Sequence, residues 1–146
     1  MPFDLSLISL TPDLRTLPGA QARIALSTRI VVVLTKLARD PRPELANRLG
    51  SEEAAERFLD LIGGMGSVWP EPVYVNPPCC PKLSYDEMMV LDLLTAAVRS
   101  DRQAFDDFLR DMLPPAACDT LYAAAGAFVT VYASGATGRN ANGDGV

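Results

Sequence analysis

The sequence contains no histidine and only two lysines, Lys36 and Lys82. The absence of histidine removes the usual general base, a common metal ligand and every Ser-His or Cys-His nucleophile arrangement. Catalysis would have to rest on carboxylates, thiols, tyrosines or these two lysines. We therefore predict that the protein is not an enzyme, and the sequence indicates no cofactor.

Cysteine is also scarce: Cys79, Cys80 and Cys118 are the only three. Because the number is odd and two of the thiols are adjacent, a disulfide framework is not expected. Free thiols indicate a reducing compartment, and we predict a cytoplasmic protein. No basic segment precedes the first apolar residues, so no signal peptide is expected. Thr120–Gly138 lacks charge but is diluted by small residues, so no membrane span is predicted.

Basic charge is unevenly distributed in this chain of net charge −5. Residues 1–50 carry seven basic and four acidic residues, a balance of +3, and residues 51–146 carry six basic and fourteen acidic residues, a balance of −8. An acidic protein is a poor non-specific ligand for nucleic acid, while the split permits a self-complementary electrostatic contact. The alternative is that both halves are ordinary solvated surfaces.

The 146 residues fit one domain, expected over 1–133, with an N-terminal arm at 1–18 and a disordered Gly/Asn-rich tail at 134–146. A first helix is predicted over Ala20–Arg39. Its expected buried face consists of Leu26, Ile30, Val33 and Leu37, and its expected exposed face of Gln21, Thr28, Arg29, Lys36 and Arg39.

Pro43–Ile62 should hold two helices that are broken at Gly50-Ser51, with Ser51 as the N-cap of the second. The spacing resembles a helix-turn-helix, but the second helix begins with acidic residues that would repel phosphates. An atypical DNA-binding regulator is thus an alternative function, not the first. A flexible connector is expected at Gly63–Ser67, and an extended proline-rich one at Trp69–Pro81.

The strongest helix signal covers Leu83–Arg99 and begins with a capping box of Ser84 and Glu87. A second capping box, Ser100 with Gln103, predicts the next helix. The apolar periodicity of the two helices makes Leu94 and Phe108 core residues. The chain as a whole is predicted to form an all-α, irregular bundle of five or six helices, with Leu83–Arg99 and Ala116–Ala133 at its centre.

The last predicted helix, Ala116–Ala133, has no charged residue after Asp119. A helix that is apolar nearly all round is either central in the bundle or half-buried by a second subunit. Val32, alone on the polar side of the first helix, would also suit a partner contact. The candidate interaction residues are therefore Val32, Tyr122, Phe128, Val129 and Tyr132.

The adjacent thiols of Cys79 and Cys80 precede a helix N-terminus and lie next to Lys82 in the sequence. Both neighbours favour the thiolate, which is the form that binds metals and attacks electrophiles. A soft-metal or redox site is therefore a hypothesis, with Cys118 as a third ligand. The alternative is that one of the pair is a small buried residue and the other is ordinary surface.

The segment Cys79-Cys80-Pro81-Lys82-x-Ser84-x-Asp86-Glu87 resembles an element of a small bacterial helical family that is grouped only as a domain of unknown function. The resemblance implies a mostly helical chain and points to Cys79, Cys80 and Pro81, but it implies no activity. The leading functional hypothesis is a regulatory or protein-interaction module whose partner is a second copy, as a homodimer, or another protein. A thiol-based sensor and the DNA-binding regulator remain alternatives.

Overall fold

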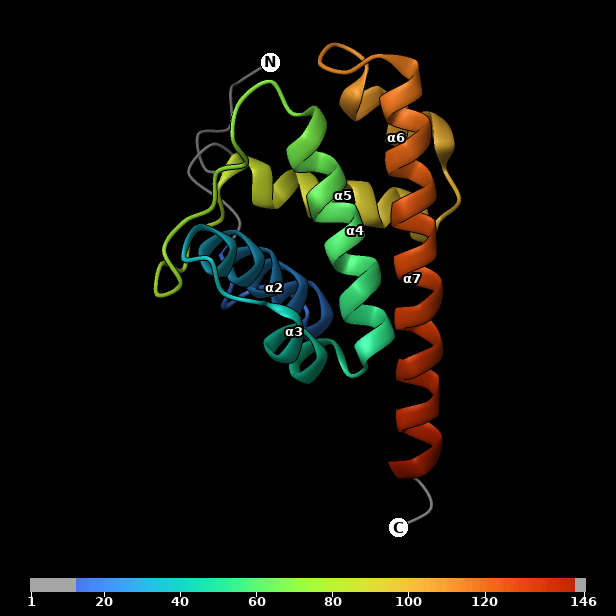
Figure 1. Cartoon of the computed structure of the whole chain (residues 1–146). Helices are drawn as coiled ribbons and strands as arrows, with labels where there is room; N and C mark the ends of the chain where they lie inside the picture. Colours follow the sequence, from blue (N-terminus) through green and yellow to red (C-terminus); the bar gives the residue numbers. More distant parts are fainter. Residues whose placement is uncertain (1–12, 144–146) are drawn as a thin grey trace, which may run out of the picture.

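The computed structural model describes residues 13–143, and within this range it contains six helices and no strand, which confirms the all-α fold (Figure 1). Predictions for residues 1–12 and 144–146 lie outside the described residues. An isolated antiparallel bridge joins Asp13 to Lys82. The helices are α2 (Gly19–Lys36), α3 (Arg42–Leu49), α4 (Glu52–Val68), α5 (Tyr85–Val98), α6 (Arg102–Leu109) and α7 (Pro115–Gly143).

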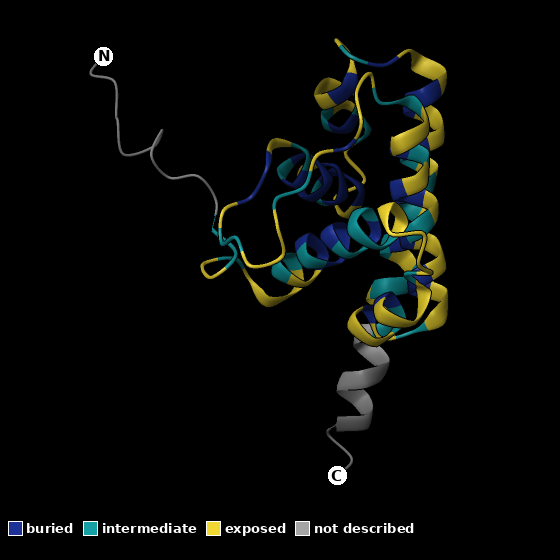
Figure 2. Ribbon diagram, turned by 60° about the vertical axis from the view of Figure 1, so that its left-hand side comes forward, coloured by how far each residue is buried: buried dark blue, intermediate teal, exposed yellow. Residues whose placement is uncertain are grey.

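The most extensive contact between helices joins α4 to α7, which run side by side (Figure 1). Phe58 and Phe128 meet there edge to face, with ring centroids 5.2 Å apart. Helix α5 lies across α7 and also contacts α2 and α6. Buried residues gather where these helices meet (Figure 2). The sequence pattern predicted α5 and α7 at the centre; they do touch, but the principal pair is α4 with α7.

Helix α4 is longer than predicted, because the glycine-rich segment expected to be a connector is helical. Each glycine costs a helix about 1 kcal/mol relative to alanine. Met65, within this segment, is fully buried, and a side chain on Gly64 would press against Leu121, with its Cβ 3.3 Å from Leu121 Cδ2. Packing against α7 thus outweighs the low helix propensity, and the glycine at 64 permits the close approach.

The buried face of α2 also differs from the prediction. Thr28 and Arg29 are buried, whereas Leu37 is 60% exposed and Leu26, Ile30 and Val33 are half-buried. The physical reason is an ion pair: Arg29 can be buried because a carboxylate and several backbone carbonyl groups surround its guanidinium. A helical wheel assigns arginine to solvent and cannot detect such a partner.

Two of the three predicted helix caps are confirmed. Ser51 accepts a hydrogen bond from the amide of Ala54, and Ser84 and Glu87 form a reciprocal capping box. The capping box predicted at Ser100 is wrong, because Asp101 caps α6 and accepts from the amide of Ala104. Ser100 instead has a φ of 53° and makes the turn between α5 and α6.

Helix α7 continues past Ala133 to Gly143, so residues 134–143, predicted to be disordered, are helical in this structure. By length and composition, its segment Pro115–Gly135 could cross a membrane, with a mean hydropathy of 1.2. This differs from the expectation that the apolar run is too dilute to span one. In the bundle, however, Leu121, Ala125 and Phe128 of the same helix belong to the buried core.

Candidate functional site

The most unusual buried feature is an ion pair between Arg29 of α2 and Glu87 of α5. Arg29 is 1% exposed and Glu87 is fully buried. The Arg29 Nε donates to Glu87 Oε2 at 2.5 Å, and Nη2 donates to Oε1 at 3.1 Å. Glu87 Oε1 also accepts from the amide of Ser84 at 2.7 Å. The same carboxylate therefore caps the N-terminus of α5 and neutralises the charge of Arg29 on α2.

The remaining N–H groups of Arg29 hold the loop that carries the thiols. Nη1 donates to the carbonyl oxygens of Pro77 at 3.2 Å and Cys80 at 2.7 Å, and Nη2 donates to that of Lys82 at 2.7 Å. All five guanidinium N–H groups therefore have acceptors. Leu14 also donates its amide to the carbonyl of Pro81 at 2.8 Å. The backbone of the loop therefore receives hydrogen bonds from two segments that are distant in the sequence, the side chain of Arg29 and the amide of Leu14.

The structure does not bring the three cysteines together. Cys79 is exposed and Cys80 is half-buried on this loop, whereas Cys118 is buried in α7. Among the described residues, no group of three His, Cys, Asp or Glu side chains is placed to hold a metal ion. The idea of Cys118 as a third ligand beside Cys79 and Cys80 therefore has no geometric basis. What remains is an exposed thiol on an ordered loop.

We expect Cys79 to react first with a small alkylating reagent and Cys118 to react last. Cys118 is 4% exposed, and its burial raises the pKa of its thiol, which lowers the thiolate fraction near neutral pH. Mass spectrometry after timed alkylation measures the order. Cys79→Ser should remove the fastest phase, whereas fast modification of Cys118 in the folded protein would contradict the structure.

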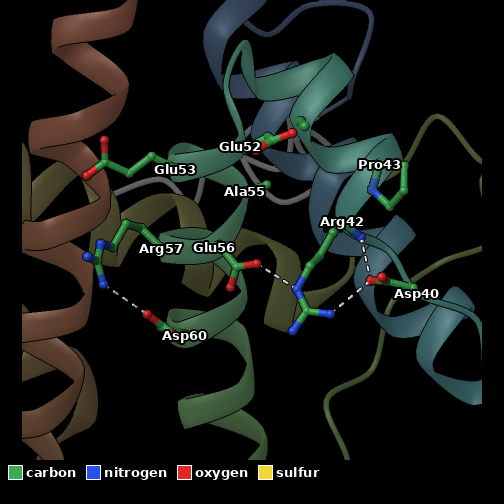
Figure 3. A pocket seen from close by; sticks show the side chains of 10 residues that line it. Asp40, Arg42, Pro43, Glu52, Glu53, Ala55, Glu56, Arg57 and Asp60 are labelled. Atoms are coloured by element: carbon green, nitrogen blue, oxygen red, sulfur yellow. Dashed lines mark hydrogen bonds and ion pairs between the residues drawn. The ribbon is translucent and has the colours of Figure 1, made fainter.

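A groove of about 700 Å³ lies between α3 and α4 and is lined by charged side chains (Figure 3). Arg42 Nε contacts Glu56 Oε1 at 2.6 Å and its Nη1 contacts Asp40 Oδ1 at 3.3 Å. Arg57 Nη1 lies 3.4 Å from Asp60 Oδ2. This is the corner whose spacing resembles a helix-turn-helix, and its acidic side chains are unfavourable for phosphate binding. Exposed pairs of this kind contribute little to stability.

A second surface follows the outer side of α5 and combines apolar side chains with one acidic and one basic residue. We call it the α5 surface and define it by six residues of that helix and its C-cap together with one residue of α6: Tyr85, Met88, Asp92, Thr95, Val98, Arg99 and Phe108. Two grooves adjoin it, of about 460 Å³ and about 350 Å³. Leu91 and Thr95 line both grooves, so the two lie next to each other along α5.

The predicted interaction residues do not form one exposed patch. Phe128 is fully buried, and Tyr122 packs edge to face on Phe105 at 5.0 Å. Val129 and Tyr132 do reach the surface, where they line the smaller groove beside Val98. Val32 is half-buried against the core. Phe128, Val129 and Tyr132 line the groove that adjoins the α5 surface, and of these three Val129 and Tyr132 are partly exposed.

Sequence reasoning missed both the Arg29–Glu87 pair and the α5 surface. One signal for the pair was available: Glu87 was already assigned to a cap, and the prolines around the thiols supply carbonyl acceptors without amide donors. The α5 surface needs the neighbours of α5 in space, which no periodicity supplies. Neither a family model, nor a curated protein, nor a solved structure matches this chain.

Proposed function

We propose that this protein is a non-enzymatic interaction module that associates with a second copy of itself through the α5 surface. The observation that carries the proposal is the clustering of exposed apolar side chains. Five large hydrophobic residues of the described chain are exposed, and three of them, Tyr85, Val98 and Phe108, belong to this one surface. Tyr85 and Phe108 line the larger groove, and Val98 lines the smaller one. Scattered exposed hydrophobic residues need no explanation, whereas exposed apolar side chains that gather along grooves are typical of an interface.

The α5 surface also has the form that helix pairing uses. Tyr85, Met88, Asp92, Thr95 and Arg99 follow one another at intervals of three, four, three and four residues. This is the spacing with which one helix presents a continuous seam to another. Thr95 turns its hydroxyl back to the carbonyl of Leu91 at 2.8 Å, so this side chain can be covered without leaving a donor unpaired.

The smaller groove extends the apolar area from α5 onto α7. Its wall includes Val129 and Tyr132, and Tyr132 is held in place by stacking on Phe128, with ring centroids 5.3 Å apart, and by a hydrogen bond from Arg23 at 3.2 Å. A wall that is already ordered loses little conformational freedom when a partner covers it. Self-association through the last helix, the hypothesis drawn from the sequence, is here combined with α5.

We expect Val98→Glu to weaken self-association about tenfold or more, because the interface would have to bury an unpaired carboxylate. Val98 is 68% exposed, so the monomer should keep its helical content and its unfolding midpoint. Leu37→Glu is the matched control, since Leu37 is 60% exposed just after α2, outside the α5 surface. Light scattering coupled to size-exclusion chromatography over a range of concentrations measures the equilibrium.

Two results would overturn this proposed function. A wild-type chain that stays monomeric at all concentrations would exclude self-association. Equal weakening by Val98→Glu and Leu37→Glu would show that the α5 surface is not the interface.

A further inference from the structure

Two opposite charges on the α5 surface lack partners. Among the described residues, neither the carboxylate of Asp92 nor the guanidinium of Arg99 has an ion-pair partner. They cannot pair with each other, because seven residues of helix separate them by about 10.5 Å along the axis. Asp92 lines the larger groove and Arg99 the smaller one.

Asp92 lies in apolar surroundings. The side chains of Leu17, Leu83 and Met88 line the same groove, in which Asp92 is the one charged residue among those described. Although the residue as a whole is exposed, desolvation by these neighbours raises the pKa of the carboxyl group above its ordinary value. A charge in such a groove is favoured when a cation is brought to it.

A two-fold axis satisfies both charges at once. Suppose that two α5 helices pack antiparallel about a two-fold axis that passes between positions 95 and 96. Positions 92 and 99 lie equally far from this axis on either side, so Asp92 of one copy lies opposite Arg99 of the other. Interfaces with two-fold symmetry repeat every contact, so the second Asp92 meets the second Arg99. A parallel arrangement would instead place each charge opposite its own copy, and like charges repel.

We infer that two copies of this chain associate through antiparallel α5 helices, with Asp92 of each copy paired with Arg99 of the other. This inference rests on the proposed function and adds to it the orientation, the axis and the residues that select the partner. Thr95 lies next to the axis, and Val98 on α5 with Phe108 on α6 supplies apolar area to be buried. The two ion pairs fix the register and disfavour other arrangements.

Charge exchange tests the inference. Asp92→Arg alone places two arginines at each contact, and Arg99→Asp alone places two aspartates there, so each variant should associate at least about tenfold more weakly than the wild type. The double variant Asp92→Arg/Arg99→Asp exchanges the two charges, so opposite charges again face each other across the interface. Its association constant should be within about threefold of the wild-type value. Analytical ultracentrifugation measures the equilibrium constants, and thermal unfolding verifies that each variant folds.

A mixture of the two single variants gives a second measurement. Unfolded variants could not form heterodimers, so association in the mixture cannot result from a loss of folding. The Asp92→Arg variant carries a positive charge at both positions of the seam, and the Arg99→Asp variant carries a negative charge at both. In a mixed pair, both contacts are therefore complementary. An equimolar mixture should form heterodimers at concentrations where each variant alone is monomeric. Glu53→Arg and Arg39→Asp make comparable charge changes outside the α5 surface and should leave association unchanged.

The outcomes separate this inference from the proposed function. If Val98→Glu disrupts the dimer but the charge variants neither weaken nor complement one another, the α5 surface is the interface and the antiparallel register is wrong. If the wild-type chain is monomeric throughout, both the proposed function and the inference fail. Restored association in the double variant and in the mixture would support the register directly.

Discussion

Arg29→Met should destabilise the protein by about 3–5 kcal/mol, because it leaves the carboxylate of Glu87 buried without its cation. Four backbone carbonyl groups in the loop of residues 77–82, here called the thiol loop, each lose a hydrogen bond from Arg29 in the same substitution. Arg23→Met is the matched control on the same helix: Arg23 is exposed, with a single hydrogen bond to Tyr132, so its loss should cost about 0.5 kcal/mol or less. Urea unfolding followed by circular dichroism measures both.

A second variant keeps this prediction testable if Arg29→Met does not fold. Arg29→Lys retains the charge but lacks the planar fork of donors, so it should lose less stability than the methionine variant. In the double variant Arg29→Met/Glu87→Met no buried charge remains, and its cost should fall below the sum of the single costs by about 1–3 kcal/mol. Additive costs would contradict an ion pair at this position.

Phe105→Ala should cost about 3–5 kcal/mol, whereas Phe108→Ala, three residues further along the same helix, should cost about 1 kcal/mol or less. Phe105 is fully buried and packs against Tyr122 at 5.0 Å, while Phe108 is 41% exposed. The sequence pattern assigned both to the core, so the structure corrects the expectation for Phe108. The two substitutions remove the same atoms from the same helix, and only their burial differs.

Calorimetry measures the unfolding temperatures of the two variants, which carry the same Phe→Ala change at different positions. A similar fall in unfolding temperature for both would show that Phe108 is covered in solution. Because Phe108 belongs to the α5 surface, the comparison is made below the concentration at which the chain associates. Leu94, only 4% exposed, should behave like Phe105 and lose about 2–5 kcal/mol on truncation to alanine.

Local signals in the sequence predicted much of the helical arrangement correctly. Ser51 and Ser84 cap helices as expected, and Gly50, with a φ of 93°, breaks the chain between α3 and α4. These features are decided within a few residues, by hydrogen bonds and by glycine, which lacks a Cβ and therefore adopts a positive φ without strain. The all-α class follows from the same local periodicity.

The errors arise where distant segments decide the outcome. Met65 keeps α4 helical through its glycines because α7 is there to bury it, and Arg29 is buried because Glu87 lies 58 positions further along the chain. The α5 surface shows the same limit. Asp92 and Thr95 of α5 line one groove together with Phe108 of α6, a neighbour that only the structure shows.

The contacts of Arg29 also bear on the cooperativity of folding. The carbonyl groups of Cys80 and Lys82 receive their hydrogen bonds from a side chain about fifty positions earlier in the chain, so the thiol loop depends on a distant segment for its conformation. These hydrogen bonds from Arg29 exist only while α2 stays docked beside the start of α5. Despite its exposed position, the loop therefore belongs to the same cooperative unit as the core, and it loses its conformation when that unit opens.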